Sequence, residues 1–196
     1  MRGSRAFRLA SAGLVVAVNA VMVAGSSGTS LAGVPARHHN QVQNGNFESP
    51  VVPGSFTHYD AGSTFTGWTV GSGSIDQTRS YMQPASGSQA IDLNGTEAGT
   101  VYQDLILRPG ATYNVVFAFA GNPSCGPVFK HMLVRFGGGV LAAVTFNSAG
   151  HSTSNMGWIL KHYQVQAPGE IVRIEFDSLT SGECGPAIDG VIVIQT

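Results

Sequence analysis

The two cysteines are the residues whose type and spacing most clearly predict chemistry. Cys125 and Cys184 are the only cysteines in 196 residues, and each is followed by Gly and Pro. The alternatives are a free reactive thiol and a metal pair, but two cysteines lack the third and fourth ligands that zinc needs. In an exported chain, which the N-terminus indicates, an even pair is most simply a disulfide. We therefore predict a structural Cys125–Cys184 bridge between two turns.

Catalytic chemistry finds little support in the sequence. Residues 150–154 read GHSTS, which lacks the final glycine of the G-x-S-x-G nucleophile elbow, and no helical pattern follows. A glycoside hydrolase needs two carboxylates at a set separation, whereas the acidic residues here are scattered singly along the chain. We predict that the chain is not an enzyme, and the less favoured alternative is a glycan-active hydrolase.

The N-terminus has the three parts of a secretory signal. Three arginines within the first eight residues precede an uncharged stretch from Leu9 to Ala24, and residues 30–32 read SLA, a small-x-Ala cleavage pattern. The alternative is a membrane anchor, but this segment is short and weakly apolar for a full span. We predict that residues 1–32 are a signal peptide and that the protein is secreted into the extracellular space.

The chain that follows the signal is thinly charged. Residues 33–196 carry seven basic and eleven acidic residues, a net charge of −4, and are enough for one domain. No basic cluster is present, so we expect neither nucleic acid nor an anionic membrane surface as a partner. No second apolar run of membrane length follows, so we expect the mature form to be a soluble monomer without a membrane span.

The elements that must position any site read as β-strands. Residues 33–43 are polar and are expected to form a flexible lead-in, and no later window has helical periodicity. Short runs of β-branched and aromatic residues lie between clusters of Gly, Pro, Asn and Ser. Nine such runs occupy residues 65–70, 89–95, 100–107, 112–122, 130–136, 140–146, 158–167, 171–179 and 187–194. We predict one all-β domain over residues 44–196, a jelly-roll sandwich of about nine strands.

Local patterns refine this expectation. In residues 171–179 (IVRIEFDSL) apolar and polar side chains alternate, which indicates a strand with one buried face. Residues 137–139 are three glycines between two runs, and they predict a hairpin turn because glycine adopts positive φ without strain. Asn94 begins an Asn-Gly-Thr sequon, which predicts N-glycosylation if the source is eukaryotic.

A series of motifs resembles a known family. In order, NGNFE lies at residues 44–48, GWTV at 67–70, AIDLNG at 90–95, FAFAGNP at 117–123 and GPAIDGV at 185–191. The chain resembles the choice-of-anchor C family of bacterial surface and secreted proteins, and the plant cell-wall proteins classed as domain of unknown function 642. The resemblance covers about residues 44–194. It implies a galactose-binding-like jelly roll, an architecture shared with many carbohydrate-binding modules.

The resemblance also implies a structural calcium ion. In similar sugar-binding jelly rolls, an acidic residue near the N-terminal motif and an aspartate in the last strand help to hold the ion, and Glu48 and Asp189 match these positions. Calcium prefers several oxygen ligands, so backbone carbonyls would have to complete the shell. The alternative is that Asp189 accepts hydrogen bonds from turn amides near residues 185–187.

A sugar site needs aromatic faces beside a few polar groups. Trp68 and Trp158 lie in strand-like runs and are expected in the core, whereas Tyr59, Arg79 and Tyr81 lie in polar segments rich in Gly and Ser. We predict these last three as ligand-binding residues.

This reading leads to a secreted, non-catalytic module that binds cell-wall or extracellular polysaccharide. The same jelly roll hosts other roles, since a fold does not determine a function. The alternative is therefore a secreted structural or protein-interaction module without a sugar site. One departure from the family bears on the choice: members often carry a tryptophan near residues 80–83, and this chain has Ser-Tyr-Met-Gln there.

Overall fold

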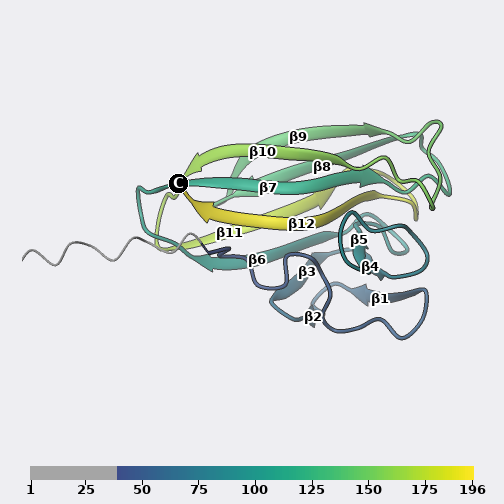
Figure 1. Ribbon diagram of the computed structural model, residues 1–196, viewed down its shortest axis with the longest axis horizontal. Helices are drawn as coiled ribbons and strands as arrows, with labels where there is room; N and C mark the ends of the chain where they lie inside the picture. The colour runs from purple at the N-terminus through teal and green to yellow at the C-terminus, as the bar shows by residue number, and fades with distance from the viewer. Residues whose placement is uncertain (1–38) are drawn as a thin grey trace, which may run out of the picture. The chain divides into compact units, whose positions relative to one another are not determined.

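The protein is an all-β sandwich. The computed structural model describes residues 39–196, which form one compact unit with no helix among them. Sheet A has the strand order β1 (Phe56–Asp60), β4 (Ser74–Thr78), β5 (Ala90–Asp92), β12 (Pro186–Gln195), β7 (Thr112–Gly121) and β10 (Ile159–Gln166). Sheet B has the order β2 (Thr64–Phe65), β3 (Trp68–Ser72), β6 (Thr100–Ile106), β11 (Ile171–Ser178), β8 (Phe129–Phe136) and β9 (Gly139–Asn147) (Figure 1). The predicted fold class is confirmed.

Twelve strands replace the predicted nine for a local reason. The run over residues 65–70 is divided by a turn at Gly67, whose φ is 84°, into β2 and β3. Strands β1 (FTHYD) and β4 (SIDQT) were missed because polar side chains interrupt their apolar residues. β1 lies at the edge of sheet A, and its residues are exposed or half-buried. Its sequence therefore needs few apolar side chains and carries little hydrophobic signal.

The core lies between the two sheets, as the alternating strands predicted. In β11 the side chains of Val172, Ile174 and Phe176 are buried, while the residues between them point outward. Phe117 of sheet A meets Phe176 of sheet B edge to face, with ring centroids 5.2 Å apart. Trp68 is buried beside them, as expected. Such aromatic contacts join the sheets through both burial and ring geometry.

The triple glycine forms the predicted hairpin between β8 and β9. Phe136 pairs with Gly139, and the two glycines between them have φ values of 59° and 84°. Both central residues of such a two-residue turn need positive φ, which explains why glycine occupies them.

The predicted disulfide between Cys125 and Cys184 is confirmed, with 5.6 Å between the two Cα atoms. A lysine that the sequence did not single out reinforces it. The Nζ atom of Lys130 donates hydrogen bonds to the carbonyl oxygens of Cys125 (2.8 Å) and Cys184 (2.6 Å), and the residue is 0% exposed. The ammonium group thus holds both halves of the bridge from the inside of the domain.

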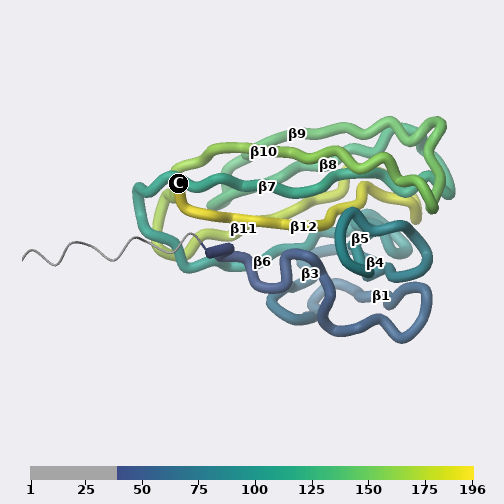
Figure 2. Tube along the Cα trace, viewed as in Figure 1, coloured from purple at the N-terminus to yellow at the C-terminus, as the bar shows by residue number. Residues whose placement is uncertain are grey.

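The folded domain begins earlier than residue 44. The backbone N–H of Gln41 donates to the Val193 carbonyl oxygen (2.8 Å), and the Asn40 side chain bonds to the backbone of β12 at Val191 and Val193. Figure 2 shows this first described segment beside the final part of β12. Residues 40–43 are therefore part of the sandwich and not of a flexible lead-in. The predicted signal peptide and residues 33–38 lie outside the described residues.

The sequon at Asn94 is not available for a glycan in the folded protein. The Asn94 side chain is 0% exposed, and its Nδ2 atom donates to the carbonyl oxygens of Thr180 (2.7 Å) and Gly182 (2.6 Å). The side-chain amide that a glycan would modify is thus buried, and it donates two hydrogen bonds within the protein. The described part of the chain contains no helix long and apolar enough to cross a membrane.

Candidate functional site

The structure separates the three predicted ligand residues. The Tyr59 ring stacks on Phe65 with centroids 4.9 Å apart, and its hydroxyl donates to the Gln77 side chain (3.2 Å). Tyr59 thus packs against the core at the edge of the sandwich, because in β1 it points to the face opposite that of His58. It offers no surface platform.

Arg79 and Tyr81 lie together at the start of the loop that joins β4 to β5, residues 79–89. The Arg79 Nη1 atom donates to the Val52 carbonyl oxygen (3.0 Å), so part of its guanidinium has a structural partner. Tyr81 is 36% exposed and meets Phe56, which is 49% exposed, edge to face with centroids 6.0 Å apart. Two accessible rings at an interplanar angle of 64° therefore stand side by side on the surface.

These two rings form one wall of a pocket, which we call the aromatic pocket. It has a volume of about 390 Å³ and is lined by Phe56, His58, Asp76, Tyr81, Gly95, Thr96, Asn122, Glu183 and Cys184. Pairing of β1 with β4 places His58 directly opposite Asp76. Phe56 lies two residues before His58 and so shares its face of the sheet. The volume is within the usual range of ligand pockets, about 300–1,000 Å³.

Acidic side chains dominate the charge of the pocket. The His58 ring contacts two carboxylates: Nδ1 lies 2.8 Å from Asp76 Oδ1, and Nε2 lies 3.2 Å from Asp60 Oδ1. The hydrogen bond to Asp76 raises the pKa of His58, while burial opposes that shift. Burial raises the pKa of Asp76, and the nearby charge of Glu183 acts in the same direction, while His58 lowers it.

A further carboxylate, Asp92, lies buried beneath the pocket. It accepts hydrogen bonds from Asn122 Nδ2 (2.7 Å), the Gly185 N–H (3.0 Å) and the Asn94 N–H (3.0 Å). Burial raises the pKa of Asp92 to about 7, although these donors oppose the shift. Asp92 thereby orients Asn122, which lines the pocket. The sequence showed Asp92 only as one of several single acids, because nothing local signals its burial.

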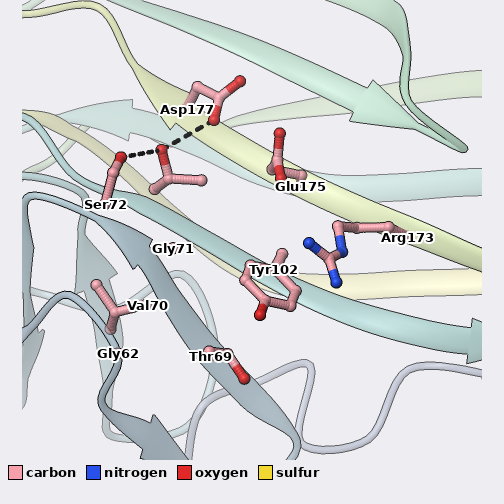
Figure 3. Close-up of a pocket in the computed structure, with 10 residues that line it drawn as sticks. Gly62, Thr69, Val70, Gly71, Ser72, Tyr102, Arg173, Glu175 and Asp177 are labelled. Atoms are coloured by element: carbon pink, nitrogen blue, oxygen red, sulfur yellow. Dashed lines mark hydrogen bonds between the residues drawn. The ribbon is translucent and has the colours of Figure 1, made fainter.

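The outer face of sheet B carries a second hollow, a groove of about 470 Å³ (Figure 3). The polar side chains of this groove form hydrogen bonds with one another or with neighbouring side chains. The Arg173 guanidinium lies 3.6 Å from the centroid of the Tyr102 ring and makes two hydrogen bonds to Asp104 (2.8 and 2.9 Å). Hydrogen bonds also run from Ser72 to Thr100 (2.9 Å) and on to Asp177 (2.9 Å). A sugar would have to displace Arg173 to reach that face of the tyrosine ring, so the aromatic pocket is the better candidate.

The two carboxylates predicted as calcium ligands anchor the loop over residues 79–89. Glu48 Oε1 accepts hydrogen bonds from the N–H groups of Ser88 (2.7 Å) and Gln89 (3.0 Å). Asp189 accepts them from the N–H groups of Ser86 (2.8 Å) and Gly190 (2.6 Å). The donors to Asp189 thus include the loop and the next residue of β12, where the register of the strand shifts. Burial raises the pKa of Asp189 to about 6.

This arrangement does not fit a shared calcium site. N–H groups, which favour an anion, point at both carboxylates, whereas calcium needs a shell of oxygens. Glu48 and Asp189 bind different parts of the loop, and no cluster of three His, Cys, Asp or Glu residues that could hold a metal occurs in the described part of the chain.

Calcium removal is therefore expected to leave the stability of the protein unchanged. Thermal unfolding of the full-length chain, under non-reducing conditions and with either calcium or excess chelator, measures this directly. A ligand that binds only the native state raises the unfolding midpoint by mass action. A midpoint that falls clearly with chelator would contradict the expectation and would restore Glu48 and Asp189 as metal ligands.

Known proteins match this chain over most of its length. Residues 40–194 match the family model described as "Protein of unknown function (DUF642)". Halomucin of Haloquadratum walsbyi is 31% identical over an alignment of 191 residues, and the match covers 93% of this chain and 2% of halomucin. The chain thus spans a small fraction of the length of that relative.

Two solved carbohydrate-binding modules superpose on this chain. The C-terminal family 22 carbohydrate-binding module of Clostridium thermocellum Xyn10B superposes with a TM-score of 0.51 and 15% identity, over 82% of this chain and 97% of that one. TmCBM61, solved in complex with β-1,4-galactotriose, superposes with a TM-score of 0.48 and 19% identity, over 81% of this chain and 99% of that one. At 15% identity, the likeness to the family 22 module shows a shared fold and no more.

Proposed function

Because the chain belongs to the DUF642 family and shares its fold with a carbohydrate-binding module, we propose that it is a secreted, non-catalytic module that binds cell-wall or extracellular polysaccharide. The observation that carries the proposal is the aromatic pocket. There the accessible rings of Phe56 and Tyr81 stand beside polar side chains in a concavity of ligand size.

The lining of the pocket suits the chemistry of a sugar. The C–H groups on one face of a pyranose ring pack against an aromatic ring, and its hydroxyl groups need hydrogen-bond partners at the rim. Phe56 and Tyr81 supply the rings. Asp76 and Glu183 can accept hydrogen bonds from hydroxyl groups, and Thr96 can donate or accept them.

The state of His58 supports a binding role over a catalytic one. A histidine that activates a nucleophile must keep one ring nitrogen free to take its proton. Both ring nitrogens of His58 contact carboxylate oxygens, those of Asp76 and Asp60. The imidazole is thus held as part of the pocket wall, and no serine or cysteine among residues 39–196 is hydrogen-bonded to it.

Removal of either exposed ring is expected to weaken polysaccharide binding about tenfold. Aromatic contacts are worth about 0.5–1.5 kcal/mol beyond their area, and about 1.4 kcal/mol is a factor of ten in affinity. The variants are Phe56→Ala and Tyr81→Ala, and the measurement is retention on a panel of soluble and insoluble glycans, followed by calorimetry with the best binder.

Tyr102→Ala is the matched control for these variants, since it removes an aromatic ring from the groove on sheet B. We expect it to bind as the unchanged protein does. If Tyr102→Ala alone lost binding, the site would lie in the groove. If the unchanged protein bound no glycan in a broad panel but captured a protein from culture medium, the alternative of a structural or protein-interaction module would replace the proposal.

A further inference from the structure

We infer that the aromatic pocket selects a cationic sugar, a polysaccharide unit that carries a free amine. This inference rests on the proposed function and narrows it to a ligand class. It follows from the combination of unbalanced acidic side chains with accessible aromatic rings in one concavity.

The aromatic pocket has an excess of acidic side chains. Asp76 and Glu183 line it, and Asp60 adjoins it through His58. His58 is the only basic residue in the lining, and it is shared between two carboxylates. Beneath the floor, Asp92 and Lys130 have opposite charges when both are ionised, and both are buried, so neither is exposed at the surface of the pocket. The surface that a ligand meets is therefore net negative.

One of these carboxylates, that of Glu183, lacks a partner among residues 39–196. Glu183 is exposed, and no residue in the described part of the chain makes a hydrogen bond or ion pair to it. Its charge acts unfavourably on the Asp76 carboxylate instead. An ammonium group bound between Glu183 and Asp76 would replace this repulsion with two attractions. A ligand with an anionic sugar, such as a uronic acid, would meet the same field as a repulsion.

The aromatic wall of the pocket also suits a cation. A cation within about 6 Å of a ring centroid is attracted by the negative face of the ring. Phe56 and Tyr81 meet at an interplanar angle of 64°, so their faces are turned in different directions. The face of one ring can pack against the sugar C–H groups, while the face of the other ring lies toward the amine.

A lysine side chain of a protein carries the same charge, but it fits the pocket less well. Its stem is aliphatic and makes no hydrogen bonds, whereas the exposed Thr96 places polar atoms in the lining. The hydroxyl groups of a pyranose can bond to those atoms, so the lining favours a sugar that bears the amine.

The test compares two ligands that differ only at the amine. The full-length chain is titrated with a β-1,4-linked glucosamine tetrasaccharide and with its fully N-acetylated counterpart. The free amine is expected to bind about tenfold more tightly at low salt, since a partly exposed ion pair and a cation–π contact act together. The ratio is expected to shrink at high salt, because ions screen exposed charges.

Matched variants locate the effect. Glu183→Gln is expected to reduce the preference for the free amine about threefold and to leave binding of the N-acetylated ligand unchanged. Asp60→Asn, at a second exposed acid, is expected to act in the same direction. Glu170→Gln removes an equally exposed acid from the turn between β10 and β11 and is expected to change neither ligand.

The outcomes distinguish this inference from the proposed function. Equal binding of both ligands, with loss in Phe56→Ala, would overturn the amino-sugar inference and leave the sugar site in place. Binding of neither ligand, nor of any neutral or anionic glycan, would overturn both. Tighter binding of an oligolysine peptide than of the glucosamine ligand would overturn the inference in favour of a basic protein segment.

Discussion

Replacement of both cysteines, Cys125→Ser together with Cys184→Ser, is expected to lower the free energy of unfolding by about 4 kcal/mol. The bridge joins residues 59 positions apart, and a cross-link over a loop of that length removes a large part of the conformational freedom of the unfolded chain. Urea unfolding of the two proteins at neutral pH measures the difference. The slope of the free energy of unfolding against urea concentration is compared as well, because it reports how much surface each protein exposes on unfolding.

The control for this variant is the unchanged protein with its disulfide reduced. It should lose the same stability as the double serine variant, because both open the same loop. A loss below about 1 kcal/mol in both would contradict the prediction. It would mean that the contacts of Lys130 with the two cystine carbonyl groups hold the turns together without the covalent bond.

The substitution Lys130→Met is expected to cost a similar amount, about 3–5 kcal/mol. Removal of one partner from a buried, hydrogen-bonded charge leaves the others unpaired, which is strongly destabilising. Here the Cys125 and Cys184 carbonyl groups lose their shared donor, and the buried Asp92 loses a nearby positive charge. Methionine nearly preserves the length and apolar character of the stem, so the variant tests the ammonium group.

The pH dependence distinguishes loss of charge from loss of packing. Burial raises the pKa of Asp92 to about 7, and that of Asp189 to about 6, while an unfolded aspartate has a pKa near 3.9. Between about pH 4 and pH 7 the native state therefore holds more protons than the unfolded state. Its stability falls as the pH rises through this window and is greatest at the acidic end.

The fall in stability with rising pH should be steeper in Lys130→Met. The substitution removes the positive charge that favours the ionised form of the Asp92 carboxylate. The loss of stability caused by the substitution should thus be larger at pH 8 than at pH 5. Equal losses at the two pH values would show that packing alone is involved. Lys161→Met is the matched control: this lysine is half-buried, and its ammonium lies 5.8 Å from the Phe119 ring centroid, a contact worth about 0.5–2 kcal/mol.

Local sequence patterns were enough to predict the sandwich fold. Alternation in residues 171–179 predicted which side chains of β11 are buried, because in a strand neighbouring side chains point to opposite faces. The triple glycine predicted its hairpin, and the two cysteines had only each other as partners. Each of these signals is contained in one short segment or in a count of residues.

The binding surface was decided by the tertiary structure. Tyr81 was predicted as a ligand residue, but its neighbour Phe56 lies in an edge strand that the sequence did not reveal, and Glu183 comes from a turn about 100 residues away. Strand pairing brings β1 and β4 together and sets His58 beside Asp76. Residues so far apart in sequence share no local pattern.

Burial and charge environment were also beyond the sequence. Asp92 and Lys130 have ordinary sequence contexts, yet both are fully buried, and Glu48 and Asp189 hold one loop by accepting its N–H groups. The strand pattern of this protein depends on periodicity along the chain, which the sequence contains. The ionisation of its acids depends on how much water the folded neighbours exclude, and only the packing of the two sheets and their loops determines that.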